Sequence, residues 1–104
     1  TEGVNTRVEL AAAAATLRDR INRAHMLAGV AIVDPTATWI EPGVALEPDS
    51  TVHPFTVLRG ATTVAAGAEI GPHVVAIDAE IGPGALEGQH RSIAHHHRLW
   101  KTGP

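Results

Sequence analysis

The sequence contains no cysteine, no tyrosine, one phenylalanine and two tryptophans. Without cysteine there is no disulfide framework, and nothing indicates the redox compartment. So few aromatic residues suit a narrow core with room only for aliphatic side chains. No apolar run approaches the roughly 20 residues that a membrane-spanning helix needs, and the first residues do not resemble a signal peptide. The net charge of −3 gives no reason to expect nucleic acid or an anionic membrane as a partner. We expect a soluble cytoplasmic protein.

What the sequence does contain is a six-residue repeat between Ile40 and Val75. Its units are IEPGVA, LEPDST, VHPFTV, LRGATT, VAAGAE and IGPHVV. The first place is always aliphatic: Ile40, Leu46, Val52, Leu58, Val64 and Ile70. The fifth place is always small or β-branched: Val44, Ser50, Thr56, Thr62, Ala68 and Val74. A period of six fits neither a helix nor a plain alternating strand. It predicts a solenoid in which each hexad supplies one short strand and one turn.

The segment before the repeat is predicted to form one α-helix. Thr6 and Glu9 make a capping box, and Gly29 supplies the left-handed residue that ends many helices. Apolar residues recur at steps of three and four and form one stripe: Leu10, Ala13, Leu17, Ile21, Ala24 and Ala28. The opposite face is polar and carries Arg18, Asp19 and Asn22. We expect Leu10, Leu17 and Ile21 to cover one end or one face of the solenoid.

The chain therefore divides into a helical arm over 1–29, β-helical coils over 30–86 and an irregular, His-rich tail over 87–104. A short strand within Val30–Trp39 is expected to lead into the first coil, because the residue before Pro35 avoids helical geometry. After Leu86 the register fails, although Ile93 and Leu99 are six apart. The tail is either non-native sequence or a different natural ending, and we expect it to be solvated or disordered.

Four histidines fall in this tail: His90, His95, His96 and His97. Adjacent histidines can bind a transition metal through imidazole nitrogen. A metal site also needs ligands that converge and partners that orient them. Three consecutive residues of an extended chain point to alternate sides, so we expect a solvated tail rather than a metal site.

The sequence resembles one protein family in EGVN at residues 2–5, in the helix, in LAGVAIVDPTATWI at Leu27–Ile40 and in the hexads. It resembles the bifunctional bacterial N-acetylglucosamine-1-phosphate uridylyltransferase/glucosamine-1-phosphate acetyltransferase. The likeness covers Glu2 to about Leu86. It implies a mainly β fold with one N-terminal α-helix and a short left-handed parallel β-helix, a hexapeptide-repeat solenoid. The left hand is an exception to the usual right-handed crossover.

The resemblance also carries expectations about sites. Members of that family use Mg and acetyl-CoA, but their nucleotide pocket would precede Thr1 and their acetyltransferase residues belong to later coils. The resemblance carries over a single residue, Asn5, which matches an asparagine that helps to bind the divalent metal. Asn5 also fits the plain role of leading into the helix. We predict no catalytic residue, no cofactor-binding residue and no cofactor for this chain itself.

Two further histidines, His53 and His73, stand at the second and fourth places of their hexads, which face outward or lie in turns. In hexad acyltransferases an outward histidine can act as a general base. Here the sequence supplies no orienting carboxylate at a defined spacing. Apart from histidine, Arg59 is the only basic residue between Ile40 and Leu86. We expect surface histidines.

Two functional hypotheses remain. The first is a non-catalytic structural, oligomerising fragment resembling the arm and first coils of an enzyme that makes UDP-N-acetylglucosamine for bacterial cell-wall precursors. The second is a small hexapeptide-repeat acyltransferase or sugar-binding protein that is active as an oligomer. Open strand edges invite association, and the resemblance implies a homotrimer; a domain-swapped assembly is the alternative. Phe55, Val57 and Val75 would be buried between subunits.

Overall fold

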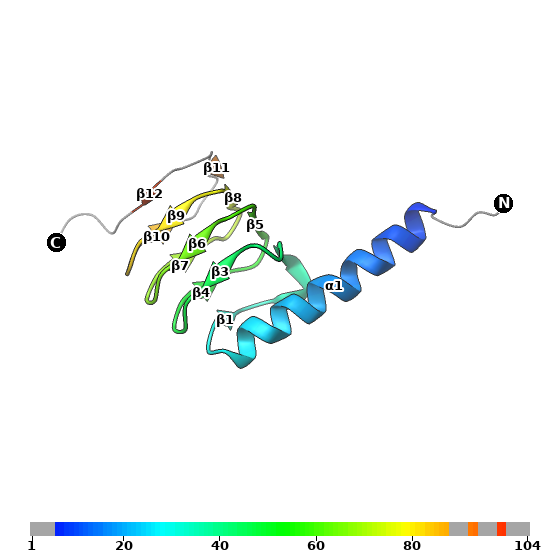
Figure 1. The fold of residues 1–104 in the computed structure, drawn as a ribbon, viewed down its shortest axis with the longest axis horizontal. Helices are drawn as coiled ribbons and strands as arrows, with labels where there is room; N and C mark the ends of the chain where they lie inside the picture. Colours follow the sequence, from blue (N-terminus) through cyan, green and yellow to red (C-terminus); the bar gives the residue numbers. More distant parts are fainter. Residues whose placement is uncertain (1–5, 88–91, 94–97, 100–104) are drawn as a thin grey trace.

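The computed structural model describes residues 6–87, 92–93 and 98–99. One helix, α1 (Arg7–Leu27), precedes the strands (Figure 1). The strands are β1 (Ala31–Ile32), β2 (Thr38–Ile40), β3 (Ala45–Leu46), β4 (Thr51–Val52), β5 (Thr56–Arg59), β6 (Thr63–Val64), β7 (Glu69–Ile70), β8 (Val75–Ile77), β9 (Glu80–Ile81), β10 (Leu86–Glu87), β11 (Ser92–Ile93) and β12 (Arg98–Leu99). A 3-10 turn, η1 (Pro35–Ala37), lies between β1 and β2.

The strands wind into a solenoid with three sides. Each side is a parallel sheet of four strands, in the orders β1-β4-β7-β10, β2-β5-β8-β11 and β3-β6-β9-β12. Successive coils stack along one axis, with α1 at the end where β1 lies (Figure 1). The predicted left-handed parallel β-helix with an N-terminal helix is confirmed. The strand expected to lead into the first coil is itself part of that coil, as β1.

The interior of the solenoid follows the hexad register. The first-place residues Ile40, Val52, Leu58, Val64 and Ile70 are buried, and Leu46 is partly buried against them. The fifth-place residues are also buried, including the polar Ser50, Thr56 and Thr62. Ser50 Oγ donates to the Glu47 carbonyl at 2.7 Å, and Thr62 Oγ1 donates to the Arg59 carbonyl at 2.7 Å. These two hydroxyls thus satisfy turn carbonyls from inside a narrow core.

Two coils depart from the regular spacing of three hexads. Eighteen residues separate Trp39 from its partner Val57, whereas twenty separate Ala31 from Thr51. The extra length lies in η1, which Asp34 caps by accepting hydrogen bonds from the backbone N–H of Thr36 at 3.0 Å and from its hydroxyl at 2.6 Å. Thr63 and Glu80 are only seventeen apart, because the Ala76–Glu80 step is one residue short.

Carboxylates tie the turns of neighbouring coils together. Glu41 accepts from the N–H of Gly60 at 2.8 Å, Glu47 from that of Ala66 at 2.9 Å and Asp78 from that of Ala61 at 2.7 Å. Each acid therefore satisfies a backbone donor one coil away, at a corner where the sheets do not supply a carbonyl. This is a structural use for acidic residues that sequence reasoning left unassigned.

Helix α1 begins and ends as predicted, but of the three stripe residues Leu10, Leu17 and Ile21 only Ile21 packs against the core. The Thr6–Glu9 capping box is present, and Gly29 has φ +101° just after the helix. Arg18, Ile21 and Asn22 face the first coil, whereas Leu10 is 57% and Leu17 46% exposed. The expectation that Leu10 and Leu17 cover the solenoid is therefore wrong. The first turns of α1 project away from the coils (Figure 1), so the stripe has nothing to cover there.

Several expectations concern residues that the structure does not describe: Asn5, His90, His95, His96 and His97. Most of the predicted tail, 87–104, is also outside the described residues. Within it, β11 and β12 pair with β8 and β9 and include Ile93 and Leu99, the two residues that are six apart. In the described part of the chain, no helix is long and apolar enough to cross a membrane.

Candidate functional site

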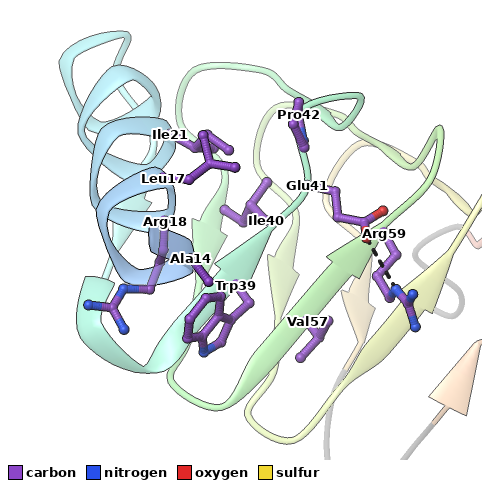
Figure 2. Close-up of a pocket in the computed structure, with 10 residues that line it drawn as sticks. All are labelled: Ala14, Leu17, Arg18, Ile21, Trp39, Ile40, Glu41, Pro42, Val57 and Arg59. Carbon is purple, nitrogen blue, oxygen red and sulfur yellow. Dashed lines mark hydrogen bonds and ion pairs between the residues drawn. The ribbon is translucent and has the colours of Figure 1, made fainter. Parts of the chain in front are cut away.

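A hollow of about 460 Å³ lies between α1 and the outer surface of the sheet that contains β2 and β5 (Figure 2). Most of its lining is apolar: Ala14, Leu17, Ile21, Trp39, Ile40, Pro42 and Val57. Its three charged lining residues are Arg18, Glu41 and Arg59. Its size lies within the usual range for ligand pockets, and one wall is a helix that projects beyond the solenoid. We call it the helix–sheet hollow.

Strand register places an apolar column on the outer surface beside this hollow. Trp39, Val57 and Val75 are Cα partners in β2, β5 and β8. The neighbouring residues Leu58 and Ala76 are fully buried in the core, so alternation turns the column outward. Trp39 is 39% exposed, which is unusual for so large an apolar side chain. We call Trp39, Val57 and Val75 the apolar column.

The charged residues around the hollow already have partners within the chain. The Arg18 guanidinium lies over the Trp39 ring, 4.9 Å from its centroid, and also pairs with Asp19 at 3.0 Å. Such a cation–π contact fixes both side chains. Arg59 Nε lies 3.4 Å from a carboxylate oxygen of Glu41, as the dashed line in Figure 2 marks. Glu41 is the one carboxylate among the lining residues, and it is held by the Gly60 N–H and by Arg59. The hollow therefore presents a binding surface with no second acid–base group beside Glu41 in its lining.

The histidines named from the sequence lie at one corner of the solenoid. His53 Nε2 is 3.2 Å from a carboxylate oxygen of Glu69. The expectation that no carboxylate orients these histidines is therefore wrong for His53. Glu69 comes from the next coil, so its pairing with His53 depends on how the coils stack, and no local sequence motif indicates it. Both side chains remain open to solvent.

His73 makes a different contact, with an aromatic ring from the coil before it. Its imidazole stacks on Phe55, with ring centroids 5.3 Å apart and an interplanar angle of 8°. Both residues occupy left-handed corners, with φ of 64°. Phe55 is 60% exposed, so the stack stands on the surface and not in a cavity. This corner can present rings to a partner, but it encloses no reaction volume.

The coils between Ile40 and Leu86 do not supply the partners that either cofactor of the resembled family calls for. Across 6–87 and the two short strands beyond, no three Asp, Glu, His or Cys side chains gather as metal ligands. The phosphates of acetyl-CoA call for basic partners, and Arg59, alone between Ile40 and Leu86, is engaged by Glu41. We derive no reaction step through either group. The metal-binding role of Asn5 stays a prediction.

Sequence reasoning missed Trp39, Arg18 and Asn22 as the residues that join helix to solenoid. For Trp39 a signal existed: it precedes the first-place Ile40, so it shares the outward sixth place with Val57 and Val75. For Arg18 and Asn22 no signal existed. Their partners are backbone carbonyls whose position depends on the finished fold.

Comparison with known proteins gives a consistent result. No family model matches the chain. It is 53% identical over 81 residues to the bifunctional protein GlmU of Cutibacterium acnes, an alignment that covers 78% of this chain and 19% of that protein. It is 50% identical over 93 residues to GlmU of Kineococcus radiotolerans, covering 88% and 19%. This chain is homologous to one segment of GlmU. A third relative, GlmU of Brevibacillus brevis, is 46% identical over 84 residues.

The match to GlmU confirms the resemblance drawn from the hexads and the helix. The chain spans about a fifth of the length of the GlmU proteins it matches. What a whole GlmU does is therefore not a property of these residues by themselves.

Proposed function

We propose that this chain is a non-catalytic structural and oligomerising piece, the arm and first coils of an enzyme that makes UDP-N-acetylglucosamine for bacterial cell-wall precursors. The single observation that carries the proposal is the outward-facing apolar column beside the helix–sheet hollow, in which Trp39 is exposed and Val57 and Val75 are half-buried. A solitary solenoid leaves these side chains partly in water, whereas a second copy would cover them. The homology to GlmU also supports a structural role, and so does the absence of a convergent acid–base pair in the described lining of the hollow. A cytoplasmic location stays a prediction.

The assembly we propose is a homotrimer with the solenoids side by side. Burying a large apolar side chain contributes roughly 1.5–3 kcal/mol. Burial of the apolar column in each copy would therefore favour association of the three chains. Phe55, which is exposed at the adjoining corner, extends the same surface. A domain-swapped assembly, in which helices exchange between copies, is the second choice.

Sedimentation equilibrium at micromolar concentration tests this proposal. We expect a mass three times the 10.9 kDa of one chain. Val57→Lys places a charge in the apolar column and should give monomers. Thr63→Lys, on the exposed surface of a different sheet, is the matched control and should leave the trimer intact. A wild-type chain that melts cooperatively as a 10.9 kDa monomer would contradict the proposal.

One observation favours the second candidate, a small hexapeptide-repeat acyltransferase. The contact of His53 Nε2 with Glu69 at 3.2 Å is the arrangement that orients a histidine base. An assay for free thiol with acetyl-CoA and glucosamine-1-phosphate tests it. Thiol release that His53→Asn abolishes and His73→Asn spares would support this candidate. Wild-type protein that releases no thiol above background would reject it and leave the structural role.

A further inference from the structure

The sheet that carries the apolar column has two unlike corners. Its strands β2, β5 and β8 run parallel, so all of them begin at one corner and end at the other. Phe55 directly precedes β5 and His73 lies just before β8, so their stacked rings stand where the strands begin, at what we call the start corner. Glu41 follows β2 and Arg59 ends β5. These two lining residues place one side of the helix–sheet hollow where the strands end, at the end corner (Figure 2).

Phe55 is exposed and held in a defined orientation. Its backbone is left-handed, with φ of 64°, which is uncommon for an aromatic residue. Its ring stacks on that of His73. Strand β5 is four residues long and spans roughly 13 Å, so the ring cannot reach the end corner of its own chain. Exposed aromatic rings of this kind are the side chains that anchor protein interfaces.

Helix α1 forms a fixed wall of the hollow. Asn22 Nδ2 donates to the Pro35 carbonyl at 2.8 Å and to the Thr38 carbonyl at 2.9 Å. Arg18 Nη1 donates to the Thr36 carbonyl at 3.1 Å. Arg18 and Asn22 are four residues apart, so they lie on the same side of the helix. These bonds hold α1 against the first coil, so the hollow is formed before any partner binds.

We propose that the Phe55 ring of each copy enters the helix–sheet hollow of the next copy, which makes α1 part of the subunit contact. The inference rests on the proposed trimer. When three apolar columns face a common axis, the start corner of each sheet meets the end corner of the next, in a head-to-tail contact that closes into a ring. An axis parallel to the solenoid keeps equal coils at one level. Strand β5 follows Phe55 and also supplies Val57 and Arg59 to the hollow, so the ring and the hollow lie at the same level.

The lining of the hollow suits an aromatic ring. Leu17 and Trp39 are large apolar side chains that line it and are exposed in a single chain. A phenylalanine side chain buries about 150–250 Å², and aromatic pairs gain further from offset or edge-to-face contact. One ring in the hollow would therefore cover Leu17, Trp39 and Phe55 together.

Charges on the two corners are complementary. Among the lining residues of the hollow, Arg18 and Arg59 outnumber the single carboxylate, Glu41. Glu69, in β7, lies just before the start corner, and its carboxylate is open to solvent. A head-to-tail contact brings these opposite charges toward each other, which favours it over a contact between two identical corners.

A double-mutant cycle in the full chain tests the contact. Phe55→Ala removes the ring. Ala14 lines the hollow at an exposed position of α1, so Ala14→Trp fills the hollow without entering the core. Ala12→Trp, at an exposed position of the same helix outside the hollow, is the matched control. Sedimentation equilibrium measures the trimer dissociation constant of each protein.

We expect Phe55→Ala and Ala14→Trp each to weaken the trimer, by about tenfold or more for each contact, and Ala12→Trp to leave it unchanged. Once the Phe55 ring is gone, a tryptophan at position 14 has nothing to displace. The double variant should therefore be no weaker than Phe55→Ala alone, a loss of additivity that reports direct contact. In the monomeric Val57→Lys background, the two substitutions should change the urea unfolding midpoint additively, which excludes coupling within one chain.

Additive effects on a wild-type trimer that Val57→Lys dissociates, or no effect of Phe55→Ala and Ala14→Trp, would overturn this contact and leave the proposed trimer standing. The same coupling in the Val57→Lys monomer would also overturn the contact. A monomeric wild type would overturn both proposals. If Phe55→Ala does not fold, Phe55→Leu takes its place, because it keeps an apolar side chain at the corner and lacks the flat ring. Additivity of Phe55→Leu with Ala14→Trp would again overturn the contact.

Discussion

The side-chain nitrogen of Asn22 lies 2.9 Å from the carbonyl oxygen of Thr38, which is 16 residues further along the chain. This contact links the arm to the solenoid through a buried polar group, beside Ile21, the member of the apolar stripe that packs against the core. It also explains why Leu10 and Leu17 stay exposed. Turning them toward the coils would move Asn22 away from the carbonyls of the first coil, and buried unpaired carbonyls are costly.

Replacing Asn22 by alanine should therefore destabilise the protein. The change leaves the Pro35 and Thr38 carbonyls unpaired, at a cost of about 1–3 kcal/mol. In a domain of about 100 residues each kcal/mol lowers Tm by roughly 4–8 °C. Asp19→Ala, an exposed position one turn earlier, is the control and should shift Tm little. Equal melting temperatures for the two variants would mean that the contact contributes nothing to stability.

The interior of the solenoid makes a second prediction, at Leu58. This side chain is fully buried in the core. Leu58→Asp places an unpaired charge among aliphatic groups, which costs far more than the stability of a small domain, so the coils should unfold. Leu58→Ala should fold with a loss of about 2–5 kcal/mol. Thr63→Asp, on the exposed surface, should melt like wild type. A Leu58→Asp protein with an unchanged circular dichroism melt would show that the register is wrong.

The hexads predicted the core well because a narrow prism constrains side-chain size locally, at every sixth residue. Val52, Leu58, Val64 and Ile70 are buried as the first-place pattern indicates. The cap at Thr6 was predictable for the same reason, since its partner Glu9 is three residues away. Contacts between coils join residues far apart in the sequence, so no local pattern predicts them.

His53 with Glu69 and Asn22 with Thr38 depend on how distant segments stack. The turn η1 makes the first coil two residues longer than three hexads, a change that no hexad count reveals. The site could therefore be predicted only as far as its outward sixth-place residues. Its helix wall depended on hydrogen bonds that form after the fold is complete.

A third prediction concerns pH and His25. Burial lowers the pKa of the His25 imidazole below its usual value of about 6.5. The unfolded chain therefore binds a proton more readily than the folded protein does. Stability from this residue is fully present above about pH 6.5 and declines as pH falls from there toward the lowered pKa. Urea unfolding midpoints between pH 8 and 5 should fall for wild type and fall less for His25→Gln.

Asp34 should affect stability in a different pH range from His25. Hydrogen bonds from the Thr36 hydroxyl and backbone N–H lower the pKa of the Asp34 carboxyl. Its stabilising effect is present above the usual carboxyl value of about 3.9 and is lost only as pH falls through the lowered pKa. Asp34→Asn should therefore leave the slope between pH 8 and 5 unchanged. Identical slopes for wild type and His25→Gln would contradict the assignment of the pH effect to His25.

The last prediction compares two glycines at left-handed corners. Gly60 has φ +67° and Gly67 has φ +80°, so alanine is strained at both, by roughly 1–2 kcal/mol. Only at Gly60 would the added methyl group overlap Asp78 Oδ1, the atom that accepts a hydrogen bond from Ala61; at Gly67 the nearest atom is 3.6 Å away. Gly60→Ala should therefore lower the free energy of unfolding more than Gly67→Ala does, by about the worth of one charge-assisted hydrogen bond, roughly 1.5–3 kcal/mol. In an Asp78→Ala background the clash and the bond are both gone, so the two glycine substitutions should then cost the same. Urea unfolding of the six proteins measures both differences, and a gap between Gly60→Ala and Gly67→Ala that persists without Asp78 would show that the corner is strained by something other than this carboxylate.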